Sequence, residues 1–428
     1  MKSSEWEEVK LGDIAFVTKL AGFEYTKYLS NNFQDKGVPV IQGRNIKNRS
    51  LNLDKAKYIT EELSNSLDRS KIKFGDILFS YVGTVGDVYL HDSNNPLHLG
   101  SNVAKISILK DNEVFNKFIY YTLQGIDSIN KISSKTKGTV QSNINMGDLR
   151  SIEIKLPSFS EQKVIANVLS TLDEKIEVNN QINKTLENMA QTVFKHWFVD
   201  FEFPDEKGNP YKSSGGKMVE SELGMIPMEW ETACLSEIGD IVAGGTPSKT
   251  KNEYYENGNI AWITPKDLSG NKGIFISEGA TNVTELGLKK SSAKILPKYS
   301  VLFSSRAPIG YLAINKNEVC TNQGFKSIVP NEGIPYQFVY FYLKNSIGYI
   351  ESIAGGSTFK EISGTAMKNL KVTLPPRNLL KEYKQIVETI FNNIENYEDI
   401  SQILSEFRDA VLPKLLSGEI EIPTEEEA

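Results

Sequence analysis

Cysteine, histidine and long apolar runs are scarce in this sequence. It has 2 cysteines and 3 histidines among 428 residues, so a disulfide framework is excluded, and neither residue type occurs with the spacing of a metal site. No stretch approaches the ~20 apolar residues that a membrane span needs, and the first residues lack the apolar core of a signal peptide. We therefore expect a cytoplasmic protein without a metal site.

The motifs of common enzyme classes are also missing. The sequence contains no Gly-x-x-x-x-Gly-Lys-Ser/Thr phosphate loop, no Gly-x-Gly-x-x-Gly after a strand and no Asn-Pro-Pro-Tyr tetrapeptide of the adenine methyltransferases. His91, His98 and His196 have no triad-like company. Acidic residues are so frequent that no pair of carboxylates in the sequence specifically indicates a catalytic site. These absences predict a binding protein with no catalytic residue and no cofactor of its own.

Charge is distributed unevenly along the chain. The formal net charge is −6, but residues 1–160 carry +3 and residues 241–380 carry +7, whereas residues 161–240 and residues 381–428 carry −8 each. An asymmetry of this kind permits the positive regions alone to contact nucleic acid. Unevenly placed solvated charge, without a nucleic-acid partner, is the alternative.

The second half of the chain repeats the first. The run Trp6–Leu11 returns as Trp230–Leu235 at an offset of 224 residues, and Leu78-Phe79-Ser80 returns as Leu302-Phe303-Ser304 at the same offset. Leu156-Pro157 returns as Leu374-Pro375 at 218. The slow drift of the offset indicates short loop deletions. Two similar units therefore predict a molecule with two related binding faces.

Each copy has a globular part followed by a long helix. Up to Pro157 the sequence shows short β-rich runs broken by Gly, Asn, Asp and Ser, which predicts an α+β domain. No Gly or Pro occurs from Ser158 to Val199, and Ser158 or Ser160 can cap a helix there. The expected organisation is a first domain at 1–157, a first long helix at 158–201, a connector at 202–229, a second domain at 230–376, a second long helix at 377–417 and an acidic tail at 418–428.

Both long helices carry an apolar stripe with steps of three and four residues. The first stripe includes Val168, Ile182 and Met189, with Asn179 as a polar member, and the second includes Ile386 and Phe407. A period of 3.5 residues is typical of a coiled coil. We expect the helices to pair antiparallel, with internal pseudo-two-fold symmetry, and to act as a spacer between the two domains. The alternative is that each helix packs on its own domain as an ordinary amphipathic helix.

Polar residues gather in loops at matching places in the two copies. Arg, Asn and Gln pair with base edges, whereas Lys, Ser and Thr suit phosphates. Turns with polar decoration are the alternative for any single loop. The candidate DNA-binding residues are Arg44, Asn45, Lys47, Tyr81, Thr84, Asn102, Lys137, Thr139 and Gln141 in the first copy, and Lys249, Thr264, Lys266, Ser305, Arg306, Asn322, Gln323 and Lys360 in the second.

Bulky residues mark the ends of both long helices. Phe194 and Trp197 close the first, and Leu415 and Leu416 close the second. These side chains are candidates for helix packing or for docking a partner protein, and core packing is the plainer interpretation of each taken alone.

An ordered set of short strings resembles one family. The chain resembles the DNA-specificity subunits of type I restriction-modification systems over nearly its whole length. The strings are Gly244–Pro247, Trp262–Leu268, Ser305–Gly310, Thr321–Phe325, Leu156-Pro157 before Glu161-Gln162, Phe194–Phe201 and Leu412–Ile420. The first copy departs from the pattern, with Tyr81-Val82-Gly83 in place of the Arg-Ala-Pro string and Asn102-Val103 where the second copy has Asn322-Gln323.

The resemblance implies a non-catalytic DNA reader. It implies two target-recognition domains, each of which reads one half of a bipartite site in double-stranded DNA, and a helix pair that sets the unread gap. It also implies two modification subunits as partners, which bind S-adenosylmethionine and methylate adenine, and two translocating restriction subunits that can join them. Two rivals stay open, namely a scaffold whose helices join proteins without reading DNA and a self-contained DNA-modifying enzyme with an unrecognised site.

Overall fold

The computed structural model describes residues 6–47, 49–136, 143–271, 273–356, 360–420 and residue 422. The chain forms two compact units. Unit 1 consists of Met1–Ile176 with Ile403–Ala428, and unit 2 consists of Glu177–Gln402. Among the described residues, no helix has the length and apolar character needed to cross a bilayer.

Unit 1 is built on mixed β-sheet. Its strands are β1 (Glu7–Lys10), β2 (Ala15–Lys19), β3 (Val38–Ile41), β4 (Ile46–Lys47), β5 (Ser50–Leu51), β6 (Lys57–Ile59), β7 (Lys71–Ile72), β8 (Ile77–Ser80), β9 (Val88–Leu90), β10 (Leu97–Leu99), β11 (Val103–Ile108) and β12 (Glu153–Leu156). One sheet has the order β6-β3-β10-β7 and another the order β2-β11-β8-β9, while β1 pairs with β12 and β4 with β5.

Unit 2 has its own set of sheets. Its strands are β13 (Met218–Ser221), β14 (Gly224–Pro227), β15 (Glu231–Cys234), β16 (Gly239–Ala243), β17 (Ile260–Ile263), β18 (Phe275–Ile276), β19 (Thr281–Val283), β20 (Val301–Ser305), β21 (Ile309–Asn315), β22 (Cys320–Thr321), β23 (Lys326–Pro330) and β24 (Lys371–Leu374). The orders are β16-β23-β20-β21-β18 and β19-β17-β22, with β15 paired to β24 and β13 to β14. The β13–β14 hairpin lies in the stretch expected to be a connector.

The two units share one strand plan. The order β2-β11-β8-β9 of unit 1 reappears as β16-β23-β20-β21, and β6-β3-β10 reappears as β19-β17-β22. In both units the strand before the first short helix pairs with the last strand, β1 with β12 and β15 with β24. The expected α+β fold with an internal repeat is therefore confirmed.

Short helices surround the sheets, and two long helices follow them. The short helices are α1 (Leu11–Ile14), α2 (Gly22–Glu24), α3 (Glu61–Ser66), α4 (Asn116–Thr122), α5 (Ile126–Lys135) and α6 (Met146–Arg150) in unit 1, and α8 (Leu235–Ile238), α9 (Pro265–Gly270), α10 (Glu285–Lys289), α11 (Tyr336–Ile353) and α12 (Gly364–Lys368) in unit 2. The long helices are α7 (Phe159–Phe194), which a π-helical turn Lys195–Val199 extends, and α13 (Arg377–Ser417). Each long helix contributes one part to each unit.

Residues at the helix ends explain where the long helices begin and stop. Ser158 and Glu161 form a capping box, in which the Ser158 N–H donates to Glu161 Oε2 (3.0 Å) and the Glu161 N–H donates to Ser158 Oγ (3.3 Å). Pro413 lies inside α13 and does not end it. The helix instead ends before Gly418, which has a φ of 75°, a conformation that favours glycine after a helix.

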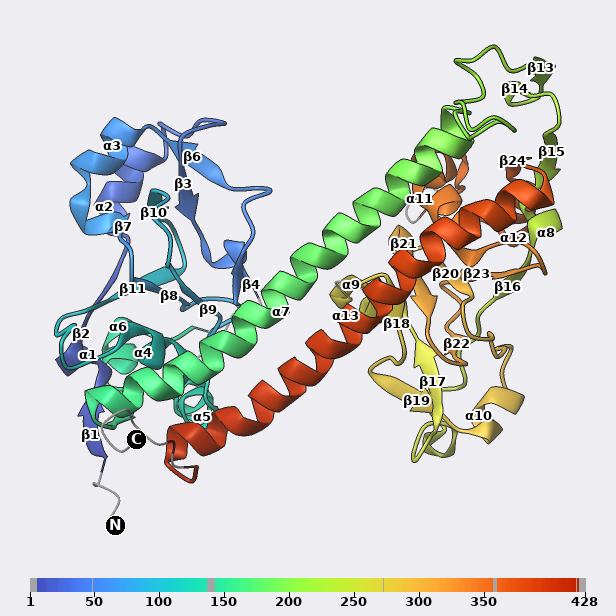
Figure 1. The fold of residues 1–428 in the computed structure, drawn as a ribbon. Coiled ribbons are helices and arrows are strands. Elements are labelled where there is room, and N and C mark those ends of the chain that lie inside the picture. Colours follow the sequence, from blue (N-terminus) through green and yellow to red (C-terminus); the bar gives the residue numbers. More distant parts are fainter. Residues whose placement is uncertain are drawn as a thin grey trace. The chain divides into compact units, whose positions relative to one another are not determined.

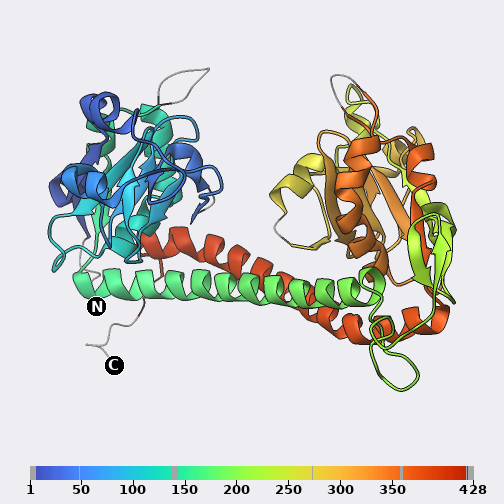
Figure 2. The same ribbon diagram turned by 90° about the horizontal axis from the view of Figure 1, so that it is seen from above.

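The long helices lie side by side and run in opposite directions within each unit (Figures 1 and 2). In unit 2, Asn179 Nδ2 donates to Ser401 Oγ (3.2 Å), while fifteen residues further along α7 the ring of Phe194 lies 6.4 Å from that of Tyr383. In unit 1, Asp173 forms an ion pair with Arg408. Residue numbers rise on one helix as they fall on the other, so the pairing is antiparallel, as expected.

The apolar stripe predicted from the sequence is only partly buried. Val168, Met189, Ile386 and Phe407 are 37%, 52%, 45% and 54% exposed, whereas the polar member Asn179 is fully buried. Ile165 of the predicted stripe is buried on the globular part of unit 1 together with its neighbours Ala166 and Leu169, whereas Tyr383, Val387, Phe391 and Ile394, which lie outside the stripe, are buried in unit 2. Within each unit the long helices therefore contact each other and also pack on the globular part. A single apolar stripe is too narrow to face both neighbours.

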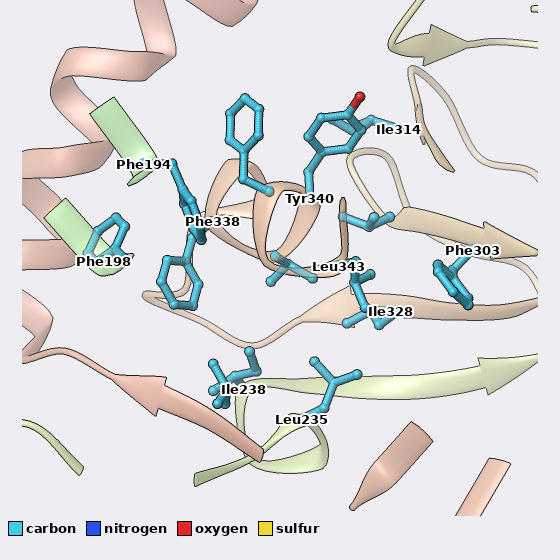
Figure 3. Packing of buried hydrophobic residues seen from close by; sticks show 14 of the residues in the cluster. Phe194, Phe198, Leu235, Ile238, Phe303, Ile314, Ile328, Phe338, Tyr340 and Leu343 are labelled. Carbon is cyan, nitrogen blue, oxygen red and sulfur yellow. The ribbon is translucent and has the colours of Figure 1, made fainter. Parts of the chain in front are cut away.

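An aromatic cluster anchors the end of α7 to unit 2 (Figure 3). Phe194 is 3% exposed, and its ring lies 5.3 to 6.4 Å from the rings of Phe198, Phe338, Phe341 and Tyr383. Aromatic pairs at these separations add to the free energy gained by burial. Packing is the observed role of Phe194 and Trp197 in unit 2, as it is of Leu415, with half-buried Leu416 beside it, in unit 1.

A buried histidine supports the strand that leads into one of the polar loops. His98 on β10 is fully buried, and its Nδ1 lies 3.1 Å from Ser64 Oγ. Burial lowers the pKa of His98 to about 4, and the nearby Lys105 ammonium also lowers it, against an opposing effect of Glu24. The imidazole is therefore neutral in the folded protein at pH 7.

We predict that Phe194→Ala lowers the free energy of unfolding of unit 2 by roughly 3–5 kcal/mol, because a large buried side chain leaves a cavity. Met189→Ala on the same helix is the matched control and should change stability by less than about 0.5 kcal/mol, since Met189 is exposed. Denaturant titration followed by tryptophan fluorescence measures both. Equal effects of the two substitutions would contradict the packing assigned to Phe194.

We also predict that His98 makes unit 1 sensitive to acid. The folded pKa lies below the usual value near 6.5, so the unfolded state binds more protons and stability is lost as the pH falls from about 6.5 towards 4. The loss attributable to His98 is at most roughly 3 kcal/mol. Unfolding free energies of the wild type and of His98→Asn, measured between pH 7 and pH 4, should converge as the pH falls. Parallel curves would exclude this role for His98.

Candidate nucleic-acid interface

In unit 2, several polar loops meet where two parallel strands end. Ile263 of β17 pairs with Thr321 of β22, and the strands run in the same direction, so the loops that follow them leave the sheet at the same edge. The Asn322 N–H donates to the Ile263 carbonyl (3.0 Å). These loops carry Thr264 and Lys266 on one side and Asn322 and Gln323 on the other.

Three further segments of unit 2 join this edge through backbone hydrogen bonds. The Gly245 N–H donates to the Thr321 carbonyl (2.8 Å), the Ser305 N–H to the Gly324 carbonyl (2.7 Å) and the Ile362 N–H to the Ser305 carbonyl (3.1 Å). The neighbouring Gly244 has no room for a Cβ, which would collide with the Asn322 carbonyl oxygen. The loops are therefore bonded to one another as well as to the sheet.

Unit 1 repeats these contacts with different residues. Ile41 of β3 pairs in parallel with Leu99 of β10, and the Gly100 N–H donates to the Ile41 carbonyl (2.8 Å). The Tyr81 N–H donates to the Asn102 carbonyl (3.1 Å), and the Ile144 N–H donates to the Tyr81 carbonyl (3.0 Å). Each bond has a counterpart in unit 2, so the same frame of loops is built twice.

The shared hydrogen bonds correct one match made from the sequence. Gly100 and Asn322 make the same bond to the preceding parallel strand, and Tyr81 and Ser305 bond to Asn102 and Gly324, respectively. Asn102 therefore corresponds to Gly324 and not to Asn322. The sequence offsets drift between 224 and 218 and left this register undetermined, whereas strand pairing fixes it at 222.

Several predicted site residues hold the loops in shape. The buried Asn45 accepts from the Gln42 N–H and donates to the Asn52 carbonyl, both at 2.9 Å. Thr264 Oγ1 donates to Asp267 Oδ2 (2.6 Å), and Asn322 Oδ1 accepts from the Gly324 N–H (2.8 Å). Ser305 is buried, and its Oγ donates to the Gly324 carbonyl (3.1 Å). Each of these four side chains therefore makes at least one hydrogen bond within the loops.

The remaining predicted residues of unit 2 lie at the surface. Lys249, Lys266, Gln323 and Lys360 are exposed. Gln323 Oε1 accepts a hydrogen bond from Thr246, and Lys360 Nζ donates to the Glu351 carbonyl (3.2 Å). Arg306 follows β20 directly, is partly exposed, and pairs with Glu361 at 3.3 Å. These side chains provide cations and an amide at the edge where the loops meet.

In unit 1 the exposed candidates border a groove. Arg44, Lys47 and Thr84 line it, together with Gly86, Asp87 and apolar residues that include Val85, Ile129 and Ile132. Arg44 Nη2 donates to the Lys55 carbonyl (3.3 Å), which holds its side chain along the loop. A groove with two cations and a hydroxyl can accept a phosphate backbone.

Tyr81 and Asn102 lie beside each other at the same edge. Tyr81 is half-buried, and Lys19 Nζ lies 5.4 Å from the centre of its ring. Burial raises the pKa of the Tyr81 phenol, so the hydroxyl stays protonated and can donate a hydrogen bond. Asn102 is exposed and has a φ of 66°. The predicted residues Lys137, Thr139 and Gln141 lie outside the described residues.

Two acidic side chains at or near these loops were missed by the sequence analysis. Arg49, at the turn between β4 and β5, pairs with Asp173 of α7 (3.5 Å), which also accepts from the Tyr121 hydroxyl (2.8 Å). Glu361 pairs with Arg306 in unit 2. Neither carboxylate stands out in a sequence with 54 acidic residues, and no motif signals these contacts.

Comparisons with known proteins agree with one another. A model of the type I restriction modification DNA specificity domain matches residues 3–188 and 227–406. The chain is 26% identical over 486 residues to the type I restriction enzyme HindI specificity subunit of Haemophilus influenzae, a match that covers 97% of this chain and 100% of that protein. It is 39% identical over 187 residues to the MjaIX specificity subunit of Methanocaldococcus jannaschii, and that match spans 43% of each protein.

A solved structure shares the fold. The crystal structure of the S subunit of a type I restriction-modification system from M. genitalium matches with a TM-score of 0.56 at 20% sequence identity, over 96% of both chains. At this identity the likeness concerns the fold, which therefore extends over almost the whole chain.

Proposed function

The chain belongs to the type I restriction modification DNA specificity family and contains two of its domains, and from this we propose that each unit reads one half of a bipartite DNA site. The observation that carries the proposal is the duplicated frame of loops. Equivalent backbone hydrogen bonds, such as Gly100 to Ile41 and Asn322 to Ile263, support the same edge in both units. A frame built twice with different exposed side chains suits the reading of two different half-sites.

The exposed residues divide into base readers and phosphate contacts. A guanidinium can bond to both acceptors of guanine in the major groove, and an amide can do the same with adenine. We assign base reading to Arg306 and Gln323 in unit 2 and to Arg44 and Asn102 in unit 1. The phosphate contacts proposed are Lys47, Tyr81 and Thr84 in unit 1 and Lys249, Lys266 and Lys360 in unit 2, with Lys137, Thr139 and Gln141 as further proposals.

The buried and half-buried polar residues of the loops have a supporting role in this proposal. The side chains of Asn45, Ser305 and Asn322 bond to the loop backbone, and that of Thr264 bonds to the Asp267 carboxylate. They keep the loops in one conformation, so that the exposed side chains meet DNA without a large loss of conformational entropy. Their replacement should therefore weaken reading by loosening the loop.

We further propose that catalysis belongs to partner subunits. In this proposal two modification subunits bind S-adenosylmethionine and methylate adenine, and restriction subunits can join the complex. The chain itself supplies sequence reading and attachment. Within the described residues no group of three or more His, Cys, Asp or Glu side chains is arranged to hold a metal ion.

Exposed apolar residues at repeated positions support two docking surfaces for the modification subunits. Val168 and Ile386 are equivalent at an offset of 218 residues, as are Met189 and Phe407, and all four are exposed. Unit 1 holds Val168 and Phe407, and unit 2 holds Ile386 and Met189. Each unit thus carries the same exposed apolar pair on its helices, and apolar surface of this kind favours a protein partner. Two copies of one subunit are the proposed occupants.

The two long helices are proposed to set the gap between the half-sites. At 1.5 Å per residue, the 36 residues of α7 and the 41 residues of α13 extend for about 50–60 Å. A change in helix length would then change the gap in a predictable way, while the loops that read bases stay the same.

A binding selection from random duplex DNA tests the function. The chain is assembled with its modification subunits, bound duplexes are sequenced, and we predict enrichment of two specified segments separated by an unspecified gap. Insertion of four residues after Asn180 in α7, with four more before Ile400 in α13, adds ~6 Å to each helix. The gap should grow by about two base pairs of ~3.4 Å, with both half-sites unchanged.

The outcomes of this selection separate the alternatives. A scaffold that does not read DNA would enrich no sequence. A single continuous site would contradict the two-unit reading, and an unchanged gap in the insertion variant would contradict the spacer role of the helices while leaving the reading intact.

A further inference from the structure

We propose that Glu361 is a specificity-determining residue, which orients the guanidinium of Arg306 for a base edge and penalises binding to the phosphates of any sequence. The inference rests on the function proposed above, in which Arg306 reads a base. It assigns a role to a carboxylate that lies among cations on a surface proposed to bind a polyanion.

Each oxygen of the Glu361 carboxylate pairs with a different cation. Oε2 lies 3.3 Å from Arg306 Nη1, and Oε1 lies 3.6 Å from Lys326 Nζ. The side chains of Arg306 and Glu361 are each 37% exposed, whereas that of Lys326 is 13% exposed. Glu361 therefore joins a buried cation to an accessible one, and the trio keeps a net charge of +1.

The backbone holds this trio in a fixed arrangement. Arg306 and Glu361 face each other in an antiparallel β-bridge, and the Ile362 N–H donates to the Ser305 carbonyl (3.1 Å). On its other side Glu361 exchanges two backbone hydrogen bonds with Gly355 (2.8 and 3.1 Å). A side chain on such a frame has few alternative positions, so the carboxylate acts on Arg306 from a defined direction.

The other carboxylate at this edge has a different task. Asp267 accepts from the Thr264 N–H (2.7 Å) and from the Ala280 N–H (3.0 Å), which makes it a cap and a loop support. The Glu361 carboxylate holds no backbone amide in the part of the chain that the structure describes, and its partners there are the two cations. The formation of the loop therefore does not by itself account for Glu361.

Within its described residues, unit 1 builds the same place without an ion pair, although Lys19, the strand partner of Ala104, is close by. The bridge between Arg306 and Glu361 corresponds to the bridge between Val82 and Asn143, and Lys326 of β23 corresponds to Ala104 of β11, since the strand partners of these residues are equivalent. The frame is thus stable without an ion pair. The fold therefore does not require Arg306, Lys326 and Glu361 at these positions. Recognition remains as the role of this trio in unit 2.

The Glu361 carboxylate has two effects on how Arg306 can bind DNA. A phosphate that approaches Arg306 meets the negative charge of Glu361 and must compete with it for the guanidinium, which costs affinity for every sequence. Meanwhile Nη1 is occupied, and Nε and Nη2 make no hydrogen bond among the described residues. Within the described part of the chain, the guanidinium thus contacts Glu361 on one side and can meet the acceptors of a base on the other.

The test is Glu361→Gln in the complex with the modification subunits. Binding to a duplex that lacks the site should become roughly threefold tighter at ~0.1 M salt, and the dependence of log K on log salt should become steeper by up to about one, as expected for one additional phosphate contact. In the binding selection, preference at one position of the second half-site should fall at least about threefold, and the first half-site should be unchanged.

Glu222→Gln is the matched control. It removes the same charge from an exposed pair with Lys371 (3.0 Å) on elements that contribute none of the interface loops, and it should change neither measurement. Glu361→Asp is the second variant, which keeps the charge on a shorter side chain. It should relax the base preference while leaving the affinity for non-specific DNA low.

The possible results of these binding measurements have different meanings for the proposed role of Glu361. No change in either measurement for Glu361→Gln would reduce the trio to a structural ion pair and overturn the inference. Loss of preference without tighter non-specific binding would mean that Glu361 itself contacts a base, which also overturns it. If the wild-type complex enriches no bipartite site, the proposed function itself is wrong, and this result does not depend on Glu361.

Discussion

The parallel contact between two short strands in each unit determines where the candidate interface forms. Strands β3 and β10 in unit 1, like β17 and β22 in unit 2, end at the same edge, and the loop after one strand bonds to the last carbonyl of the other. The segment after β8 or β20 bonds to one of these loops, and a further segment with Ile144 or Ile362 bonds to Tyr81 or Ser305 in turn. Because the loops share backbone hydrogen bonds, their exposed side chains are presented by a rigid support, which recognition of a base edge requires.

The duplicated frame separates the fold from the specificity that it carries. The same strand order and the same loop contacts hold Arg306, Lys326 and Glu361 in unit 2 and Val82, Ala104 and Asn143 in unit 1. Charges at these positions are not needed for the frame, so they are free to differ between units. This freedom is what a protein with two recognition sites needs, because function depends on side chains placed on a fold rather than on the fold itself.

Local patterns predicted more of the fold than of the site. The repeat, the long helices and the cap at Ser158 follow from periodicity and helix-end chemistry, which act over a few residues. The burial of the helix faces was predicted less well, since Val168 and Phe407 belong to the apolar stripe but are exposed. In the loops, Asn, Thr and Ser can contact a base or can hydrogen-bond to the loop itself, so residue type alone did not reveal that Asn45 is buried. The pairing of Arg306 with Glu361 joins residues far apart in the sequence and became visible only in the tertiary structure.

Amide hydrogen exchange of the assembled complex, with and without DNA that carries the selected site, tests the central claim most directly. The account predicts slower exchange, on DNA binding, in the loops after β3, β8 and β10 in unit 1 and in the loops after β17, β20 and β22 in unit 2, all at the edges described above. Protection in only one unit, or protection confined to the long helices with all of these loops unchanged, would contradict it.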